Sequence, residues 1–303
     1  MHNILVTGGN GQLGSEIKNL EKNHQKYSFY FTDIKELDIT NQLSVKTFIE
    51  KKNIDIIINC AAYTAVDKAE VEKDIAEKVN YKGVQNLVDA LKTVNGKLVH
   101  ISTDYVFNGE NFVPYKESDT VSPIGVYGET KRKGELAVLN SDIDGVVIRT
   151  SWLYSSYGNN FVKTMLKLGD EREELGVIFD QIGTPTYAKD LAQICITIIL
   201  KSNNTLSSNG RLYHYSNEGV ASWYDFAKEI MILGDNDCKV KPIETKDYPT
   251  PAKRPHYSIL NKSKIKIDFD IEIPFWKDSL KECIIKCIFS VSGVTKLIAG
   301  VTL

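Results

Sequence analysis

Tyr127 and Lys131 stand four positions apart in the stretch VYGETK, a spacing that places both side chains on one face of a helix. A free tyrosine has a pKa of about 10, and a neighbouring ammonium lowers that pKa by favouring the phenolate. Thr103 ends the run KLVHIST, 24 residues before Tyr127, and a threonine hydroxyl can hold a carbonyl oxygen in place. Together the three side chains favour carbonyl reduction or alcohol oxidation with a nicotinamide. Taken alone, the Tyr–Lys spacing is more typical of a core tyrosine beside a solvated lysine, so the interpretation depends on the surrounding elements.

A glycine-rich loop, ILVTGGNGQLGSEI, lies near the start of the chain and places Gly8, Gly11 and Gly14 between an apolar run and a helix-like stretch. Such glycines allow the turn, let a pyrophosphate approach the backbone, and bring the helix close to the strand. Asp33 follows Gly14 by 19 positions, where an acidic residue reaches the adenosine ribose. Its charge favours NADH, while nearby Lys35 leaves NADPH open. The alternative is an ordinary glycine-rich turn.

The first half of the chain alternates between two kinds of stretch. Short apolar runs rich in Val and Ile are typical of strands buried on both faces: NILVTG, YSFYFTD, DIIINCAA, KLVHIS and GVVIRTS. Helix-period stretches such as 41–52 and 80–94 separate them, which predicts a parallel sheet with right-handed crossovers. We therefore expect an α/β fold, a Rossmann-like doubly wound parallel sheet with a smaller C-terminal substrate-binding lobe.

The second half is less regular. It predicts helices over NNFVKTMLKL, PTYAKDLAQICITIIL and ASWYDFAKEIMIL, the last capped by Ser222, with a strand at RLYHYSN and a final helix from Trp276. Four prolines predict a loop over 242–256. The expected NAD(P)-binding domain spans 1–150 plus about 186–216, and the substrate-binding lobe spans about 151–185 and 217–288. Residues 289–303 stay unassigned.

The composition excludes several classes of protein. The 303 residues carry a formal net charge of -2 without basic or acidic blocks, which argues against nucleic-acid binding. The apolar runs fall short of the roughly 18 residues of a membrane span, and no signal peptide is evident, so we expect a soluble, cytoplasmic protein. The five cysteines lack metal spacing and are expected to be buried, reduced thiols.

The motifs in this order resemble those of the extended short-chain dehydrogenase/reductases, and within them the dTDP-4-dehydrorhamnose reductase family. The resemblance covers roughly residues 3 to 287. It is carried by TGGNGQLG, NCAAYTAVDKAE, HISTDYVFNG, SPIGVYGETKRKGE, IRTSWLYSSYGNNFVKTML, DQIGTPTYAKDLA and YPTPAKRPHYSILN. It implies reduction of the C4 keto group of dTDP-4-dehydro-6-deoxy-L-mannose to dTDP-L-rhamnose with NADH or NADPH, in cell-surface polysaccharide biosynthesis.

The resemblance also implies roles for individual residues. Tyr127 would protonate the C4 oxygen, Lys131 would lower the pKa of Tyr127 and bind the ribose, and Thr103 would orient the keto group. The cofactor would be bound by Tyr127 and Lys131 together with Gly8, Gly11, Gln12, Leu13, Gly14, Asp33, Asp38, Ile39, Ala61, Ala62, Tyr63 and Thr64. The sugar nucleotide would meet Thr103, Asp104, Tyr105, Trp152 and Arg254.

Several of these assignments have alternatives. An arginine fork suits a diphosphate, but Arg254 is equally read as a solvated surface charge, and Trp152 as a core residue. Glu16 matches one Mg²⁺ ligand of some relatives, but the sequence offers no carboxylate cluster, so Mg²⁺ is left open as a cofactor and no metal ligands are assigned. The sequence does not fix the oligomeric state, and a homodimer is one alternative. The function also has alternatives: a reductase of another nucleotide-deoxysugar, or a non-catalytic protein like the regulatory subunit of methionine adenosyltransferase.

Overall fold

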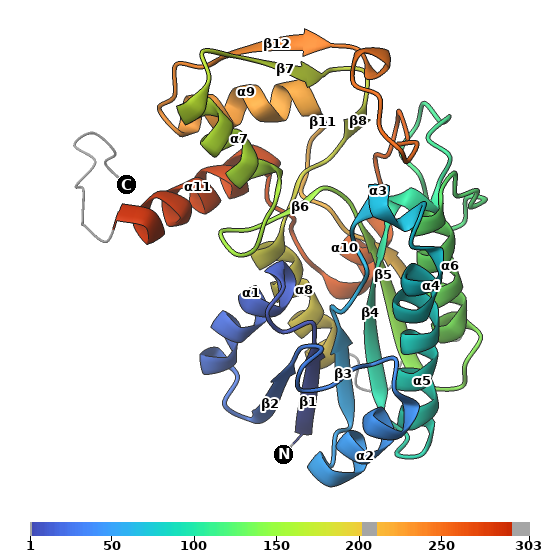
Figure 1. Cartoon of the computed structure of the whole chain (residues 1–303). Helices are drawn as coiled ribbons and strands as arrows, with labels where there is room; N and C mark the ends of the chain where they lie inside the picture. Colours follow the sequence, from blue (N-terminus) through green and yellow to red (C-terminus); the bar gives the residue numbers. More distant parts are fainter. Residues whose placement is uncertain (1, 202–210, 293–303) are drawn as a thin grey trace.

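A six-stranded parallel sheet forms the larger part of the molecule in the computed structural model, which describes residues 2–201 and 211–292 (Figure 1). The sheet contains β1 (His2–Thr7), β2 (Tyr27–Thr32), β3 (Ile56–Asn59), β4 (Lys97–Thr103), β5 (Asp144–Thr150) and β10 (Leu212–His214). Their order is β10-β5-β4-β3-β1-β2, with every neighbouring pair parallel. The chain reverses its direction of winding between β1 and β3, and such a switch point is where open α/β sheets bind ligands. The predicted fold class is confirmed.

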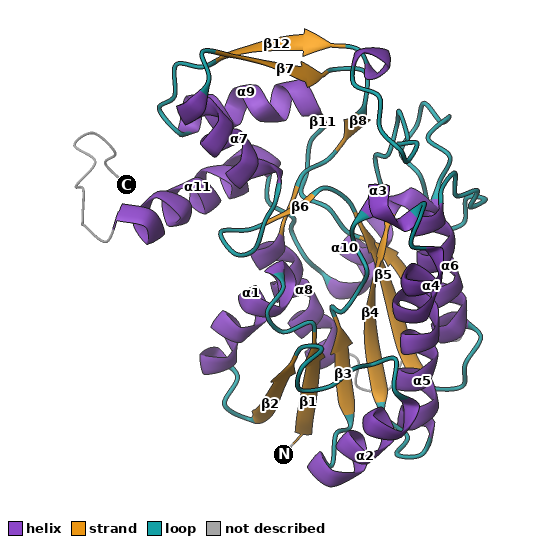
Figure 2. Cartoon of the chain, in the orientation of Figure 1, coloured by secondary structure: helices purple, strands orange, loops and turns teal. Residues whose placement is uncertain are grey.

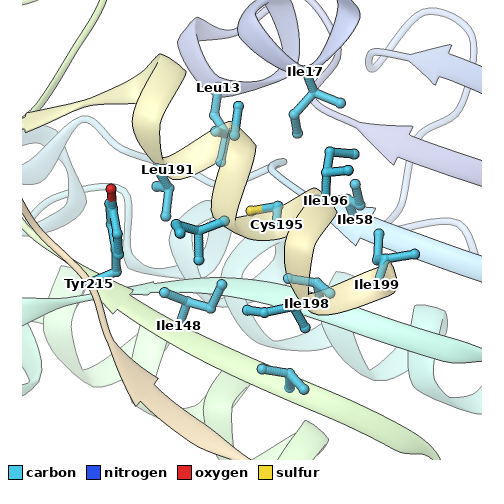
Figure 3. Close-up of a cluster of buried hydrophobic side chains, with 14 of the residues drawn as sticks. Leu13, Ile17, Ile58, Ile148, Leu191, Cys195, Ile196, Ile198, Ile199 and Tyr215 are labelled. Atoms are coloured by element: carbon cyan, nitrogen blue, oxygen red, sulfur yellow. The ribbon is translucent and has the colours of Figure 1, made fainter. Parts of the chain in front are cut away.

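Helices cover both faces of this sheet (Figure 2). One face packs against α1 (Gln12–Leu20), α8 (Ala188–Lys201) and α10 (Ser263–Phe269). The other face packs against α2 (Gln42–Lys52), α5 (Val84–Lys92) and α6 (Val126–Leu139). In Figure 3, Ile17 of α1 and Cys195 of α8 lie over Ile58 and Ile148 of the sheet, which shows why these strands read as continuous apolar runs.

The helix predicted over 80–94 begins earlier and is interrupted. After the short α3 (Val66–Ala69), a continuous helical stretch runs through α4 (Lys73–Glu77), the π-helical segment η2 (Lys78–Gly83) and α5. The extra residue of a π-helical turn redirects one side chain, and here Asn80 turns inward and is buried. Gly83 permits the close approach of Ile39, because a Cβ there would lie 2.7 Å from the Ile39 side chain.

A smaller lobe lies above the carboxyl ends of the strands (Figure 1). Its helices are α7 (Phe161–Glu171), α9 (Trp223–Leu233) and α11 (Trp276–Ser292). Three short strand pairs complete it: β6 (Leu153–Tyr154) with β9 (Thr186–Tyr187), β7 (Glu174–Ile178) with β12 (Lys239–Ile243), and β8 (Ile182–Gly183) with β11 (Ala221–Ser222). One buried cluster built around Phe226, Tyr154 and Trp276 holds it together. Ser222 caps α9 through a reciprocal capping box with Asp225, as predicted.

The remaining elements are short 3₁₀ turns: η1 (Glu21–Asn23), η3 (Asp104–Val106) and η4 (Thr245–Asp247). The last of these lies in the proline-rich stretch 242–256, which is mostly loop, as predicted. Of the predicted tail 289–303, residues up to Ser292 continue α11, and the rest lies outside the described residues. The domain boundaries stay predictions. In the described part of the chain, each helix is too short or too polar to cross a membrane.

Candidate active site

A cavity of about 750 Å³ opens at the carboxyl ends of β1, β3, β4 and β5, beneath the lobe. Its wall contains nearly all the residues predicted for the site, although they come from many separate segments. These are Gly8, Gly11, Gln12, Leu13, Asp33, Asp38, Ile39, Ala61, Ala62, Tyr63, Thr64, Thr103, Asp104, Tyr105, Tyr127, Lys131 and Trp152. Gly14 and Arg254 stand outside this wall. The structure therefore places the glycine loop and the Thr–Tyr–Lys set at one cavity.

The glycine loop is shaped by close backbone contacts. Gly8 has a φ of +64°, and a Cβ on it would lie 2.8 Å from the backbone nitrogen of Ala61. Gly14 packs underneath, since a Cβ there would lie 2.4 Å from the carbonyl oxygen of Gly8. Helix α1 begins directly after Gly11, which supplies no capping side chain, and its first turn carries no acidic residue. The unpaired N–H groups and the helix dipole at this end fit the pyrophosphate of a dinucleotide.

Asp33 follows β2 at the edge of the same loop. Its carboxylate accepts hydrogen bonds from the backbone N–H of Ile34 at 2.8 Å and of Asn10 at 3.3 Å, which fixes it at the cavity wall. A carboxylate oxygen has further lone pairs and can accept a ribose hydroxyl. Asp38 is oriented similarly by the backbone N–H of Thr40 at 2.9 Å. Both carboxylates thus lie at the cavity wall, and their binding of the adenosine half of a cofactor stays a prediction.

Thr103 ends β4 and is bound on two sides. Its hydroxyl donates to Oδ1 of Asp104 at 3.1 Å and accepts from the backbone N–H of Tyr105 at 3.2 Å. Burial raises the pKa of Asp104 to about 6, and hydrogen bonds from Ser258 and Thr103 partly oppose that rise. A carbonyl oxygen entering the site would compete with Asp104 for the Thr103 hydrogen.

Tyr127 lies in the first turn of α6, whose start is fixed by a hydrogen bond from the backbone N–H of Val126 to Glu70 at 2.9 Å. Its ring meets Tyr105 edge-on, with centroids 5.4 Å apart. Burial raises the pKa of Tyr127 to about 12; a hydrogen bond with Thr103 lowers this pKa and the charge of Asp104 raises it. The phenol is therefore protonated at neutral pH and able to donate its proton.

Lys131 is buried on the same face of α6, and its amine donates to the carbonyl oxygen of Ile101 at 2.5 Å. Burial lowers the pKa of Lys131 to about 8, while the negative charge of Glu135 raises it. Burial is the largest influence on the pKa of Tyr127, and the Lys131 amine donates to a backbone carbonyl. The lowering of the Tyr127 pKa by Lys131 stays a prediction.

Trp152 adopts a left-handed backbone conformation, with a φ of 47°, that is unusual for a bulky residue. Its ring stacks on Trp223 with centroids 3.6 Å apart, and Gly183 leaves room beside it, since a Cβ there would lie 2.7 Å from the indole. Trp152 thus lines the cavity with one face of its ring stacked on Trp223. A backbone outlier at a cavity wall is typical of a functional site.

Arg254 is held away from the cavity wall. Its guanidinium donates to Asp67 at 2.8 Å and also to Thr250 and the carbonyl of Ala252. The guanidinium is thus paired within the protein and is not the solvated surface charge that the sequence also allowed. Its charge nevertheless reaches Tyr105, whose pKa it lowers against the effect of burial. A substrate-binding role for Arg254 stays a prediction.

Two asparagines that support the site were not predicted from the sequence. Asn80 accepts from the backbone N–H of Tyr63 at 2.8 Å and donates to its carbonyl at 3.1 Å and to Thr130 of α6 at 3.2 Å. It thereby ties the cavity loop after β3 to the helix that carries Tyr127. Asn160 caps α7 and donates to Gln12 of the glycine loop at 3.0 Å. The two asparagines before an apolar helix could have indicated Asn160 as a capping residue. No sequence pattern indicates the π-helical turn that contains Asn80.

Glu16 is buried and accepts hydrogen bonds from Ser155 at 2.7 Å and from Asn19 at 3.4 Å. Across residues 2–201 and 211–292, no three His, Cys, Asp or Glu side chains group as metal ligands. Four of the cysteines are buried as predicted, whereas Cys60 is half-buried and lines the cavity.

The fold, the glycine loop and the order of Thr103, Tyr127 and Lys131 define the class of extended short-chain dehydrogenase/reductases. The family model described as RmlD substrate binding domain matches residues 1–288. The dTDP-4-dehydrorhamnose reductase of Aggregatibacter actinomycetemcomitans is 43% identical over 288 residues, covering 93% of this chain and 98% of its own. The chain belongs to the RmlD family of dTDP-4-dehydrorhamnose reductases.

Solved structures agree with that placement. A dTDP-4-dehydrorhamnose reductase from Clostridium acetobutylicum is 45% identical, with a TM-score of 0.87, covering 93% of this chain and 98% of its own. The enzyme from Bacillus anthracis, solved in complex with NADP, is 41% identical, with a TM-score of 0.89, covering 94% and 99%.

Proposed function

We propose that this protein reduces the C4 keto group of dTDP-4-dehydro-6-deoxy-L-mannose to dTDP-L-rhamnose with NAD(P)H, in nucleotide-sugar biosynthesis for cell-surface polysaccharide. The observation that carries the proposal is the meeting of Thr103, Tyr127 and Lys131 at the cavity that the glycine loop also lines. The full-length similarity to reductases of this substrate supports the choice of sugar nucleotide. The set of three intact side chains argues against the non-catalytic alternative.

The chain's own residues divide the reaction between them. Bound NAD(P)H supplies a hydride. Tyr127, protonated at neutral pH, donates its proton to the C4 oxygen as the carbonyl is reduced. Thr103 orients that oxygen, and Lys131, one turn along α6, carries a positive charge beside the phenol as it becomes a phenolate.

The cofactor fits this chain on structural grounds. The glycine loop leaves the start of α1 open to a pyrophosphate, and added Cβ atoms at Gly8 or Gly14 would collide with backbone. Asp33 favours a free 2′-hydroxyl and hence NADH, whereas the Bacillus anthracis relative was solved with NADP. The order of preference between the two stays a prediction, as do the homodimer and the cytoplasmic location.

Product analysis tests the substrate. The purified protein is mixed with NADH or NADPH and dTDP-4-dehydro-6-deoxy-L-mannose, which the preceding epimerase generates in place. The expected product carries two more hydrogens than the substrate and co-elutes with dTDP-L-rhamnose. A UDP-linked 4-keto-deoxysugar is the matched competitor. Cofactor binding without turnover of the dTDP sugar, or a preference for the UDP sugar, would contradict the proposal.

A further inference from the structure

Glu135 lies four residues after Lys131 in α6, so the two side chains share one helix face. Its carboxylate is fully buried and forms a bidentate salt bridge with Arg149. Nε of Arg149 donates to Oε1 at 2.7 Å, and Nη2 donates to Oε2 at 2.8 Å. Arg132 adds a third bond at 2.7 Å. A buried carboxylate is costly unless it is paired in this way, so the arrangement fixes the position of Glu135 tightly.

Arg149 connects this carboxylate to the reacting end of the sheet. It lies on β5 in register with Ser102, and the next pair in the same register is Thr150 with Thr103. The Ser102 hydroxyl also lies against Glu135 and lowers its pKa. The Glu135–Arg149 contact therefore ties α6 to the two strands at the level of Ser102, which lies between Thr103 and the Ile101 carbonyl that Lys131 contacts.

Resting on the proposed function, we infer that Glu135 is a positioning residue of the reaction: clamped by Arg149, it fixes α6 against the sheet and supplies the buried negative charge that balances Lys131. Burial alone would favour the neutral amine, and Glu135 is the strongest group acting in the opposite direction. A neutral Lys131 could not support the developing phenolate.

The titratable groups on the elements packed against Glu135 and Lys131 are mostly neutral. On β4, His100 is kept neutral because burial and the Lys131 charge lower its pKa, and Cys60 after β3 is kept a neutral thiol by burial. On β10, His214 is kept neutral, with a pKa lowered to about 3 by burial and Arg149.

Two further acidic groups lie at the margins of this cluster. Beyond Arg149, Glu117 accepts from the backbone N–H of His214 at 3.0 Å. On the far face of α6, Lys133 pairs with Glu77 of α4 at 2.9 Å. Neither Glu117 nor Glu77 is among the groups that shift the pKa of Lys131. Glu135 is therefore the carboxylate whose removal should change that pKa.

The pH profile of turnover separates this role from a merely structural one. In Glu135→Gln, the loss of negative charge should lower the pKa of Lys131 below its present value of about 8. The alkaline limb of kcat/KM should then move down by about one pH unit, giving a roughly 10-fold greater loss at high pH than at low pH. The acid limb should stay in place. Glu129→Gln, on the exposed face of α6, is the control and should match wild type.

Two further measurements keep the inference open to refutation. NADH binding by fluorescence needs no sugar substrate, and its alkaline midpoint should move down in Glu135→Gln as well, even if turnover of the dTDP sugar fails in every variant. Glu135→Asp keeps the charge but withdraws it from Arg149. It should leave the alkaline limb unmoved and lower kcat about 10-fold at unchanged KM. If Glu135→Gln does not fold, Glu135→Asp provides the test. An equal loss at all pH values in Glu135→Gln, unmoved limbs, or wild-type kcat in Glu135→Asp would overturn the assignment.

Discussion

Thr103 donates its hydroxyl hydrogen to Asp104 across 3.1 Å, and this bond connects the last residue of β4 to a carboxyl whose pKa is about 6. The same oxygen accepts from the backbone N–H of Tyr105, so the hydroxyl is held in one orientation. The keto oxygen of a substrate must exchange with Asp104 for that hydrogen. In the proposed reaction, Thr103 is thus preorganised by a neighbour that the substrate replaces.

Thr103→Val tests this relationship because valine keeps the shape and removes the hydroxyl. We expect kcat/KM to fall by about 10²-fold, and stability to fall by about 1 kcal/mol because η3 loses its cap. Thr103→Ser restores a hydroxyl and should recover most of the activity. Steady-state kinetics of the three proteins, with melting temperatures as a folding check, measure the difference; equal activity in Val and Ser variants would contradict the role.

Asp33 sets the expected cofactor preference. Asp33→Asn removes the negative charge that disfavours a 2′-phosphate while keeping a hydrogen-bonding side chain of the same size. The ratio of kcat/KM for NADPH over NADH should rise by about 10-fold. Asp247, which is remote from this cavity, provides a matched control as Asp247→Asn. A ratio that is unchanged in Asp33→Asn would place the ribose elsewhere.

Gly14 has no room for a side chain. In Gly14→Ala the new Cβ would lie 2.4 Å from the carbonyl oxygen of Gly8 and 2.6 Å from the Cα of Gly9, so the loop itself must shift. We expect cofactor affinity to fall by more than about 10-fold, with a destabilisation of about 1–3 kcal/mol. Gly176→Ala, at an exposed position of β7, meets only the Ile243 side chain at 3.2 Å and should bind cofactor normally. Fluorescence titration with NADH distinguishes the two; normal binding by Gly14→Ala would contradict the assigned loop.

His214 predicts an acid sensitivity of folding. Its pKa is about 3 in the folded protein against 6.5 ordinarily, so between these values the unfolded chain binds more protons and stability falls as pH falls. At pH 5 this one group should remove about 2 kcal/mol relative to pH 7.5. Urea unfolding of wild type and His214→Gln at both pH values measures it. The variant should lose less stability on acidification; an identical loss would assign the sensitivity to other groups.

The sequence was sufficient to predict those features of the fold and the site that depend on residues close together in the chain. The glycine loop, the strand ends and the Tyr–Lys spacing each lie within a short stretch, and the parallel sheet brings their carboxyl ends together by topology alone. Helix α9 is likewise readable from Ser222 and its reciprocal Asp225. These features follow from residue types a few positions apart.

Contacts between distant segments were not readable in the same way. Asp67 and Arg254 are 187 residues apart, and their hydrogen-bonded pairing could not be read from the sequence. The burial of Tyr127 and Lys131, and the Ile101 carbonyl that receives the amine, could not be read from the spacing of the two residues. Asn80 is buried within the π-helical segment η2, and no residue pattern indicated that segment.

The most direct measurement of the central claim is the oxidation of NADH and NADPH, followed near 340 nm, by wild type and Tyr127→Phe with dTDP-4-dehydro-6-deoxy-L-mannose. Phenylalanine removes only the hydroxyl that gives the proton, so cofactor binding should persist while kcat falls by at least about 10²-fold. Turnover by Tyr127→Phe within a few-fold of wild type would show that Tyr127 is not the proton donor and would contradict the account.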